Sequence, residues 1–321
     1  MNKAELASRL RLPVIASPMF LVSGVDLVLA ECRAGIVGSF PALNARPVEV
    51  FDEWLCRIED GLAESAHLNP APYAVNLIVH RTNARLSADI ETCAKHKVPI
   101  IITSLMPPGD VVAAAHSYGG LVYHDITTVR HAEKAAEQGV DGLIVVCNGA
   151  GGHAGRLSPF ALLHEVRKVF KGTIVLAGSI VTGRGILAAQ ALGADFAYMG
   201  TRFIATREAN AADAYKQMIV DSASKDIIYT NAISGIHGNY LAQSLINAGL
   251  DPENLPQRDA ASYDSKTRSE RPKAWKDIWG AGHGVGGIDS VPSVADCVAQ
   301  LEREYHDART DLLGNIAHAA E

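Results

Sequence analysis

The sequence predicts an α/β fold, a (β/α)₈ TIM barrel in which parallel strands alternate with helices. The 321-residue chain contains short apolar runs at regular intervals, and a segment with helical periodicity follows most of them. Near-continuous apolar runs are typical of parallel strands that are buried on both faces. Eight such runs occur before residue 200, and eight is the number of strands that closes a barrel. An open, doubly wound sheet is the alternative arrangement, and the pattern leaves it open.

The predicted strands are short and apolar, and they cover residues 13–16, 35–38, 73–79, 98–103, 121–124, 143–147, 174–177 and 196–199. The predicted helices between them cover residues 26–33, 48–64, 84–96, 109–117, 128–138, 158–169 and 183–192. The helix that completes the eighth unit comes late, as an amphipathic segment at 293–305. We therefore expect the barrel to comprise residues 1–205 and 274–321. Residues 206–273, with a helix over 206–224, are expected to form a helical insertion that covers the barrel mouth.

Charge and cysteine content exclude several function classes. The formal net charge is −6 and no long run of lysine or arginine occurs, so nucleic acid and anionic membranes are not expected partners. The five cysteines are scattered without a CxxC motif, which argues against a disulfide framework or a zinc site and favours a reducing compartment. No signal-peptide core or membrane-spanning run is apparent. These features predict a soluble cytoplasmic protein.

One histidine stands in a glycine-rich loop directly after the sixth predicted strand. The stretch is DGLIVVCNGAGGHAG at 141–155, and the histidine is His153. The loops after the strands of a barrel carry its functional groups, and imidazole exchanges protons near neutral pH. Glycine also allows a flat ligand to approach the backbone. We predict that His153 is a catalytic base or acid beside a bound cofactor; a structural or solvated histidine is the alternative.

Small residues follow the seventh and eighth predicted strands, where barrels commonly bind phosphate. Gly178 and Ser179 follow the seventh strand, and Gly200 and Thr201 follow the eighth. Backbone N–H groups and the two hydroxyls could hold a phosphate there. Ordinary tight turns are the alternative explanation for these glycines.

Other candidate residues lie at strand ends. Pro18 and Met19 follow the first strand, and Ser104 follows the fourth. Asn76 is a polar residue within an apolar run, so its amide needs backbone or ligand partners. His124 ends the fifth strand and is either a ligand contact or a core histidine with a satisfied hydrogen bond. The late segment WKDIWGAGHGVGG follows no apolar strand, so we interpret it as a loop that returns to the barrel mouth.

Together these segments resemble the nitronate monooxygenase family, formerly called 2-nitropropane dioxygenases. The resemblance rests on PVIASPM, AVNLIV, AGGHAG, AGSIVTGRG and GADFAYMGTRFIATRE, with NAISGIHGNYL, AGLDPENLP and KAWKDIWGAGHGVGGI in the tail. It implies a TIM barrel that binds FMN without a covalent link. It also implies oxidation of alkyl nitronates by O₂ to a carbonyl compound and nitrite, and of neutral nitroalkanes where a base first removes the α-proton. An NAD(P)H-dependent flavin reductase, acting on quinones or enoyl thioesters, is an alternative on the same fold.

The resemblance also assigns roles to single residues. His153 corresponds to the family's motif histidine. The expected cofactor contacts are spread over several loops: Pro18, Met19, Asn76, His124, Gly151, Gly152, Gly178, Ser179, Gly200 and Thr201. Among them, Gly178, Ser179, Gly200 and Thr201 correspond to the grip on the FMN phosphate, and Gly151 and Gly152 to backbone neighbours of the isoalloxazine ring.

The sequence departs from the family pattern in four places. Gly149 stands where the family often has an acidic residue, and His124 matches a lysine that contacts the flavin. His237 and His283 replace a proline and a glutamine; they are candidate substrate contacts, and tolerated substitutions are the alternative. A barrel that binds a phosphorylated ligand without redox chemistry is a further alternative, and the sequence leaves a homo-oligomer open.

Overall fold

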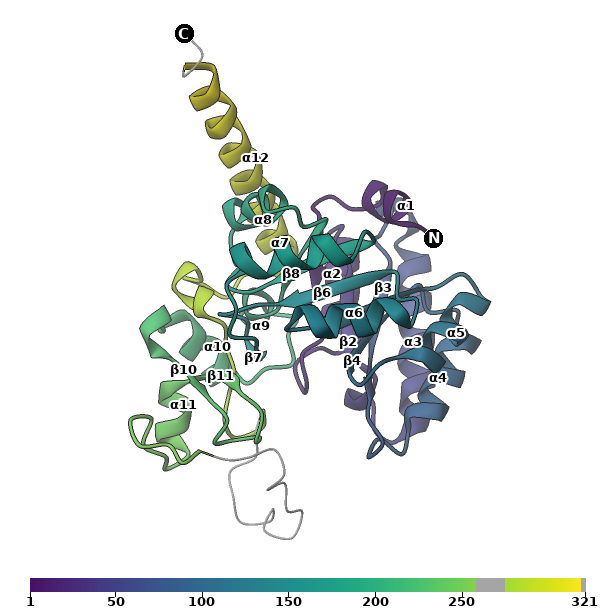
Figure 1. Cartoon of the computed structure of the whole chain (residues 1–321), viewed down its shortest axis with the longest axis horizontal. Helices are drawn as coiled ribbons and strands as arrows, with labels where there is room; N and C mark the ends of the chain where they lie inside the picture. Colours follow the sequence, from purple (N-terminus) through teal and green to yellow (C-terminus); the bar gives the residue numbers. More distant parts are fainter. Residues whose placement is uncertain (258–274, 319–321) are drawn as a thin grey trace.

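Eight parallel strands form a nearly closed barrel in the computed structural model, which describes residues 1–257 and 275–318 (Figure 1). The barrel strands are β1 Val14–Ala16, β2 Gly38–Pro41, β3 Tyr73–Val79, β4 Ile100–Leu105, β5 Leu121–Ile126, β6 Gly142–Val146, β8 Thr173–Ala177 and β9 Phe196–Met199. Each strand from β2 onward pairs with the next barrel strand in the chain, and β9 returns to pair with β1. A parallel bridge from Ile15 to Val37 links β1 to the segment that leads into β2, at the other end of the sheet. The predicted barrel is therefore confirmed, and the open sheet is excluded.

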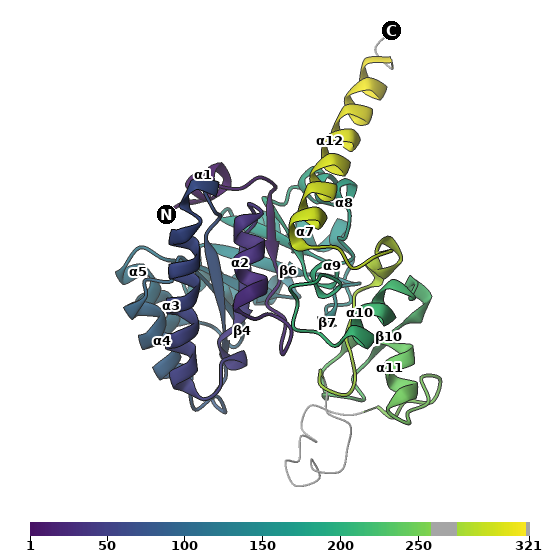
Figure 2. The ribbon, with the colours of Figure 1, turned by 180° about the vertical axis from the view of Figure 1, so that it is seen from behind.

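Helices surround the barrel and connect its strands (Figure 2). They are α2 Val25–Arg33, α3 Val48–Glu64, α4 Leu86–Lys95, α5 Gly109–Ser117, α6 Val129–Glu137, α7 Pro159–Val169 and α8 Gly183–Ala191. The predicted helix bounds agree with these to within two residues. A further short helix, α1 Lys3–Ser8, precedes β1 and was not predicted; Asn2 and Glu5 form a capping box at its start.

The second predicted strand is displaced by three residues. The sequence predicts 35–38, whereas β2 begins at Gly38. Gly35 has a φ of +87° and completes the turn after α2, a conformation that favours glycine. Ile36 and Val37 are buried on the approach to β2, so their apolar character reflects burial before β2 begins.

Strand side chains alternate between two cores, and this alternation decides which residues can reach the barrel interior. The inner core draws residues from the barrel strands, including Ala74, Ile102 and Tyr123. The outer core lies between the barrel and its helices, and it contains their sequence neighbours Val75, Ile101 and Val122. Residues 76, 104 and 125 lie two positions beyond the inner-core residues, so their side chains face the interior near the carboxyl ends of the strands.

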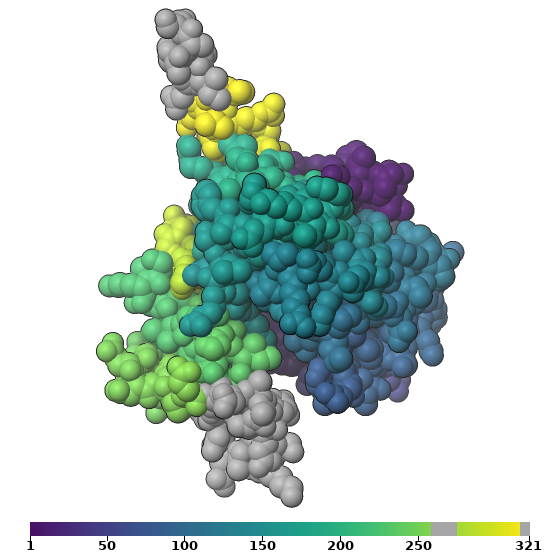
Figure 3. Space-filling view, viewed as in Figure 1, coloured from purple at the N-terminus to yellow at the C-terminus, as the bar shows by residue number. Residues whose placement is uncertain are grey.

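Much of the described chain between β9 and the last helix forms a lobe beside the barrel, which is green in Figure 3. Residues 206–273 were expected to be helical, but the described part contains α10 Asp213–Val220, α11 Ala242–Asn247 and two strands, β10 Ile227–Thr230 and β11 Gly238–Leu241. The predicted helix over 206–224 is therefore limited to α10. Both strands join β7 Gly152–His153 in a small antiparallel sheet. Residues 258–273 of the predicted insertion lie outside the described residues.

The helix α9 Thr201–Ile204 follows β9, and the 3₁₀ turn η6 His283–Gly287 precedes the last helix, α12 Val294–His318. This last helix is longer than the predicted 293–305; it packs on α8 and α2 and extends away from the barrel (Figure 1). Among the described residues, no helix is long and apolar enough to span a membrane.

Candidate active site

His153 lies on β7, at the edge of the small sheet rather than within the barrel. Its strand pairs with β11, where Gly238 is opposite His153. The imidazole Nε2 lies 2.9 Å from Ser234 Oγ, and the ring packs edge-on against Trp275 with 5.5 Å between ring centroids. The residue is exposed to solvent, yet desolvation by the surrounding protein atoms lowers the pKa of the imidazole. The ring is therefore biased toward its neutral form.

The hydrogen bonds around Ser234 bear on which ring nitrogen of His153 carries the proton. Ser234 Oγ lies 3.0 Å from the carbonyl oxygen of Ile236, which can only accept. When the Ser234 hydroxyl donates to this carbonyl, its oxygen accepts from His153, and the imidazole carries its proton on Nε2. Nδ1 then has the lone pair. A neutral imidazole in this tautomer can act as a base through Nδ1.

The glycines of the His153 loop are explained by contacts with neighbouring loops. Gly149 has a φ of +82°, and a Cβ there would lie 2.1 Å from Ser179 Oγ. A Cβ at Gly151 would lie 3.0 Å from the backbone nitrogen of Gly282 and 3.1 Å from Thr201 Oγ1. The late WKDIWGAGHGVGG segment thus returns to the barrel mouth, as predicted. This close packing accounts for a glycine, not an acidic residue, at position 149.

The loops after β8, β9 and β1 meet at the same end of the barrel. Gly178 and Ser179 both have positive φ, at 140° and 55°. Thr201 Oγ1 accepts a hydrogen bond of 2.9 Å from the backbone N–H of Gly282. A Cβ at Gly200 would lie 3.6 Å from the Met19 sulfur, so the loop after β1 lies beside the loop after β9. The structure therefore gathers the predicted phosphate loops and Met19, with Pro18 next to it in sequence.

A row of polar side chains crosses the barrel interior on three adjacent strands. Asn76 Nδ2 donates to Ser104 Oγ over 3.0 Å, and Ser104 Oγ donates to Asp125 Oδ2 over 2.6 Å. Asp125 Oδ1 is buried without a hydrogen-bond partner among the described residues. Burial raises the pKa of Asp125 to about 6, against the hydrogen bond from Ser104, which lowers it. Burial and the nearby Asp125 charge raise the pKa of Tyr198 well above its ordinary value.

The structure corrects the prediction that His124 contacts the cofactor. His124 Nδ1 lies 2.8 Å from Thr103 Oγ1, and both residues stand on the outer face of the barrel. Burial lowers the pKa of His124 to about 4, so the ring is a neutral core histidine with a satisfied hydrogen bond. Asp125, the next residue, takes the interior position. The sequence interpretation missed it, although the alternation in LVYHDI that places Tyr123 inside also places Asp125 there.

The two histidines predicted to contact substrate lie at different ends of the His153 loop. His237 precedes β11 and stacks on Tyr229, with 5.1 Å between ring centroids. Its carbonyl oxygen accepts a hydrogen bond from the Ala154 N–H, so it lies close to His153. His283 lies at the other end, where its N–H donates to the Gly149 carbonyl over 3.0 Å. Their contact with substrate stays a prediction.

A family profile described as nitronate monooxygenase matches residues 4–304. The chain belongs to the nitronate monooxygenase family. It is 29% identical to a nitronate monooxygenase of Paraburkholderia phytofirmans, over 91% of this chain and 92% of that protein. It is also 28% identical to a Rhodococcus jostii protein named (3aS,4S,5R,7aS)-5-hydroxy-7a-methyl-1-oxo-octahydro-1H-indene-4-carboxyl-CoA dehydrogenase, over 83% of this chain and 73% of that one.

Two solved structures share the fold. FabK from Thermotoga maritima aligns with a TM-score of 0.74 at 21% identity, over 97% of this chain and 98% of that one. A nitroalkane oxidase from Streptomyces ansochromogenes aligns with a TM-score of 0.75 at 24% identity, over 96% of this chain and 99% of that one. Membership of the nitronate monooxygenase family makes the chain a flavin-dependent oxidoreductase.

The interior of this family member suits a flavin in one observable respect. Asp125 Oδ1 is a buried polar atom without a partner in the described part of the chain, and such atoms are costly unless a ligand or water satisfies them. A flavin ring carries N–H and carbonyl groups along one edge, and these can bond to a row of amide, hydroxyl and carboxyl groups. The residues present therefore fit a flavin at the carboxyl end of the barrel.

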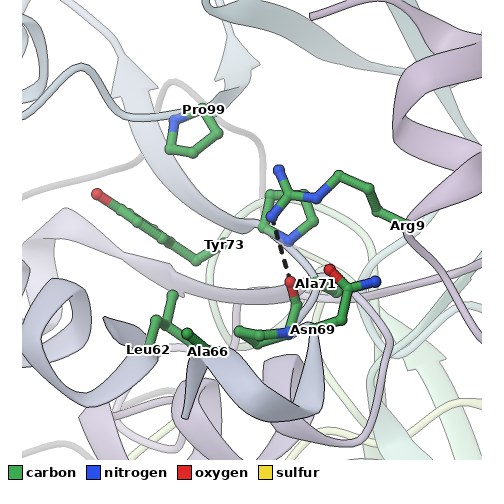
Figure 4. Close-up of a pocket in the computed structure, with 9 residues that line it drawn as sticks. Arg9, Leu62, Ala66, Asn69, Ala71, Tyr73 and Pro99 are labelled. Carbon is green, nitrogen blue, oxygen red and sulfur yellow. Dashed lines mark hydrogen bonds between the residues drawn. The ribbon is translucent and has the colours of Figure 1, made fainter. Parts of the chain in front are cut away.

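A separate cavity of about 350 Å³ opens at the opposite, amino end of the barrel (Figure 4). Tyr73, the first residue of β3, and Pro99, which precedes β4, both line it. Arg9 reaches into it and donates to the Pro70 carbonyl over 3.2 Å. Because active sites of barrels lie at the carboxyl ends of the strands, this cavity is not the site of the family's chemistry.

Proposed function

We propose that the chain binds FMN at the carboxyl end of its barrel and oxidises alkyl nitronates with O₂ to a carbonyl compound and nitrite. The observation that carries the proposal is the arrangement of His153. Its imidazole has a lowered pKa, which favours the neutral ring, and it stands in a loop packed against both candidate phosphate loops. Where the substrate is a neutral nitroalkane, Nδ1 of this ring removes the α-proton.

Bound FMN would supply the electron-transfer chemistry of the reaction. The protein would hold the cofactor at two places, the barrel interior and the loops after β8 and β9. Asn76 and Asp125 offer polar groups inside the barrel, where apolar side chains would surround the flat ring of the cofactor. Ser179 and Thr201 offer hydroxyls on the loops after β8 and β9, where a phosphate binds in many barrels.

The role of His153 is proton transfer and substrate orientation. Nδ1 takes a proton from the α-carbon of a nitroalkane, and the C–H electron pair passes to the nitro group, which forms the nitronate. Ser234 holds Nε2 and so fixes the ring while the proton moves. A well-placed base of this kind contributes about 10²–10⁴-fold to the rate. A substrate that enters as the nitronate needs no such step.

The test compares the two substrate forms with the His153→Asn variant. Oxidation of neutral nitroalkanes should fall by about 10²-fold or more, whereas oxidation of preformed nitronates falls much less. His164→Asn is the matched control, because His164 is an exposed histidine on α7, outside the small sheet. An equal loss on both substrates in His153→Asn would remove the proton-transfer role.

The second candidate function is an NAD(P)H-dependent flavin reductase that acts on a quinone or an enoyl thioester. It is supported by the Rhodococcus jostii relative, whose name gives a carboxyl-CoA dehydrogenase. Anaerobic mixing with NADH or NADPH separates the two proposals, since a reductase loses its oxidised-flavin absorbance rapidly. Purified protein that takes up no FMN when the cofactor is added would support the third alternative, a barrel that binds a phosphorylated ligand without redox chemistry.

A further inference from the structure

Three side chains with metal-ligating atoms meet on the outer surface of the barrel, away from the candidate active site. Asp52 and Cys56 are four residues apart on α3, so they share one face of that helix. His96 is the C-cap residue of α4, the neighbouring helix. A carboxylate oxygen, the thiol sulfur and an imidazole nitrogen all lie within 4.8 Å of one another.

The imidazole of His96 is held in place by carboxylates on both sides. Nδ1 lies 3.1 Å from each carboxylate oxygen of Glu59, about one turn further along α3 than Cys56. Nε2 lies 2.8 Å from Asp52 Oδ1, and only 7% of the side chain is exposed. A ligating histidine in a metal site almost always donates its other ring N–H to a carboxylate, carbonyl or water, which fixes the ring. Glu59 is placed to accept that N–H from His96.

We propose that Asp52, Cys56 and His96 form a binding site for Zn²⁺, with water at the fourth position. Thiolate, imidazole and carboxylate are the three ligand types that zinc takes in proteins, and three protein ligands with one open position make a known coordination set. On binding, the Cys56 thiol and Nε2 of His96 each release a proton to solvent, and Nε2 exchanges its contact with Asp52 for the metal.

The other cysteines cannot compete for the metal. Cys56 is exposed, whereas the remaining four are buried: Cys32, Cys93, Cys147 and Cys297. Burial raises the pKa of each buried thiol, so these thiolates are disfavoured. The scattered cysteines predicted no zinc site because they form no CxxC motif; this site instead uses one thiol with side chains from two helices.

The Lys95 ammonium group would compete with a metal ion for the Asp52 carboxylate. Its nitrogen lies 2.6 Å from Asp52 Oδ1 and forms an ion pair with that carboxylate. The Lys95 side chain is 64% exposed, so it can leave without a burial cost when a metal arrives. Lys95→Ala should accordingly bind metal more tightly than the wild type.

The experiment titrates Co²⁺, a spectroscopic substitute for Zn²⁺, into the untagged full-length protein after treatment with a chelator and dialysis. We expect one equivalent to bind with a thiolate-to-cobalt absorption band in the near ultraviolet. Cys56→Ser should lose this band, and Glu59→Gln should weaken binding by about 10–100-fold. One equivalent of Zn²⁺ should displace the cobalt and abolish the band.

The matched control is His116→Ala, which removes an exposed histidine from a comparable pair. His116 Nε2 lies 2.9 Å from Asp141 Oδ2, but no cysteine joins this pair in the described metal-ligating clusters. The control should bind Co²⁺ as the wild type does. The proposal is overturned if the wild type shows no saturable binding, or if Cys56→Ser and His96→Gln keep the wild-type band and affinity. Circular dichroism of each variant shows that the fold is retained.

Discussion

Replacing Asp125 with asparagine removes a buried carboxyl whose pKa burial raises to about 6, from an ordinary value of 3.8. The substitution keeps the shape of the side chain and gives it a neutral amide. In the unfolded chain the carboxyl ionises near its ordinary pKa, whereas in the folded protein it keeps its proton up to about pH 6. Between these two values the folded state binds more protons than the unfolded state, so the wild type loses stability as the pH rises.

The size of the effect follows from the two pKa values. Each pH unit in this window costs about 1.4 kcal/mol, which gives a total of about 3 kcal/mol. Asp125→Asn has no such carboxyl, so its free energy of unfolding lacks this dependence on pH. The free energy of unfolding of the wild type, measured relative to Asp125→Asn, should therefore fall by about 2 kcal/mol between about pH 4.5 and pH 7.5.

Urea unfolding of the apoprotein at a series of pH values measures this difference directly. Ser104→Ala provides a second comparison, because it removes the 2.6 Å hydrogen bond that lowers the Asp125 pKa. In that variant the loss of stability should extend to higher pH. A difference between wild type and Asp125→Asn that stays constant from about pH 4.5 to 7.5 would refute the assignment of Asp125 as a buried titrating group.

Three further predictions concern other positions. Gly149→Ala should destabilise the fold by about 2–4 kcal/mol, from its positive φ and its contact with Ser179 Oγ; urea unfolding should show that adding Ser179→Ala restores part of this loss. Glu31 is fully buried and burial raises its pKa, so the free energy of unfolding of the wild type, relative to Glu31→Gln, should fall by up to about 1.4 kcal/mol per pH unit from about pH 4.5 until the pH reaches the raised pKa, as urea unfolding at several pH values can show. His124→Gln should leave flavin binding, followed by fluorescence quenching of added FMN, unchanged, and cost about 1 kcal/mol for its bond to Thr103.

The barrel itself was predictable because each of its units has a local signature. The helix α3 begins and ends where the sequence predicts, since Pro47 precedes it and a change of composition follows Glu64. The strand β3 likewise matches its apolar run residue for residue. The buried residues of each element lie close together in the sequence, so hydrophobic periodicity alone identifies these elements.

The small sheet was not predictable in this way. β7 consists of Gly152 and His153 alone, which is too short to show any alternation. It is a strand only because Gly238 and Asn239 of β11, more than eighty residues later, pair with it. Pairing between distant segments leaves no local pattern, so the position of His153 beside Ser234 needed the structure.

The error at the fifth strand has a simple physical cause. The predicted run stopped at His124, whereas β5 continues to Ile126. Side chains alternate across a strand, so an assignment one residue away moves a side chain from the interior to the outer face. The sequence interpretation therefore made His124 a cofactor contact, whereas in the structure Asp125 takes the interior position.

The most direct test of the central claim is anaerobic mixing of the FMN-loaded protein with a nitronate and, separately, with NADH. The nitronate anion of 2-nitropropane is the probe, and the absorbance of oxidised flavin is followed before air is admitted. We predict that the nitronate lowers this absorbance, that NADH does not, and that nitrite accumulates once O₂ is present. Rapid loss of the absorbance with NADH and none with the nitronate would contradict the proposed function.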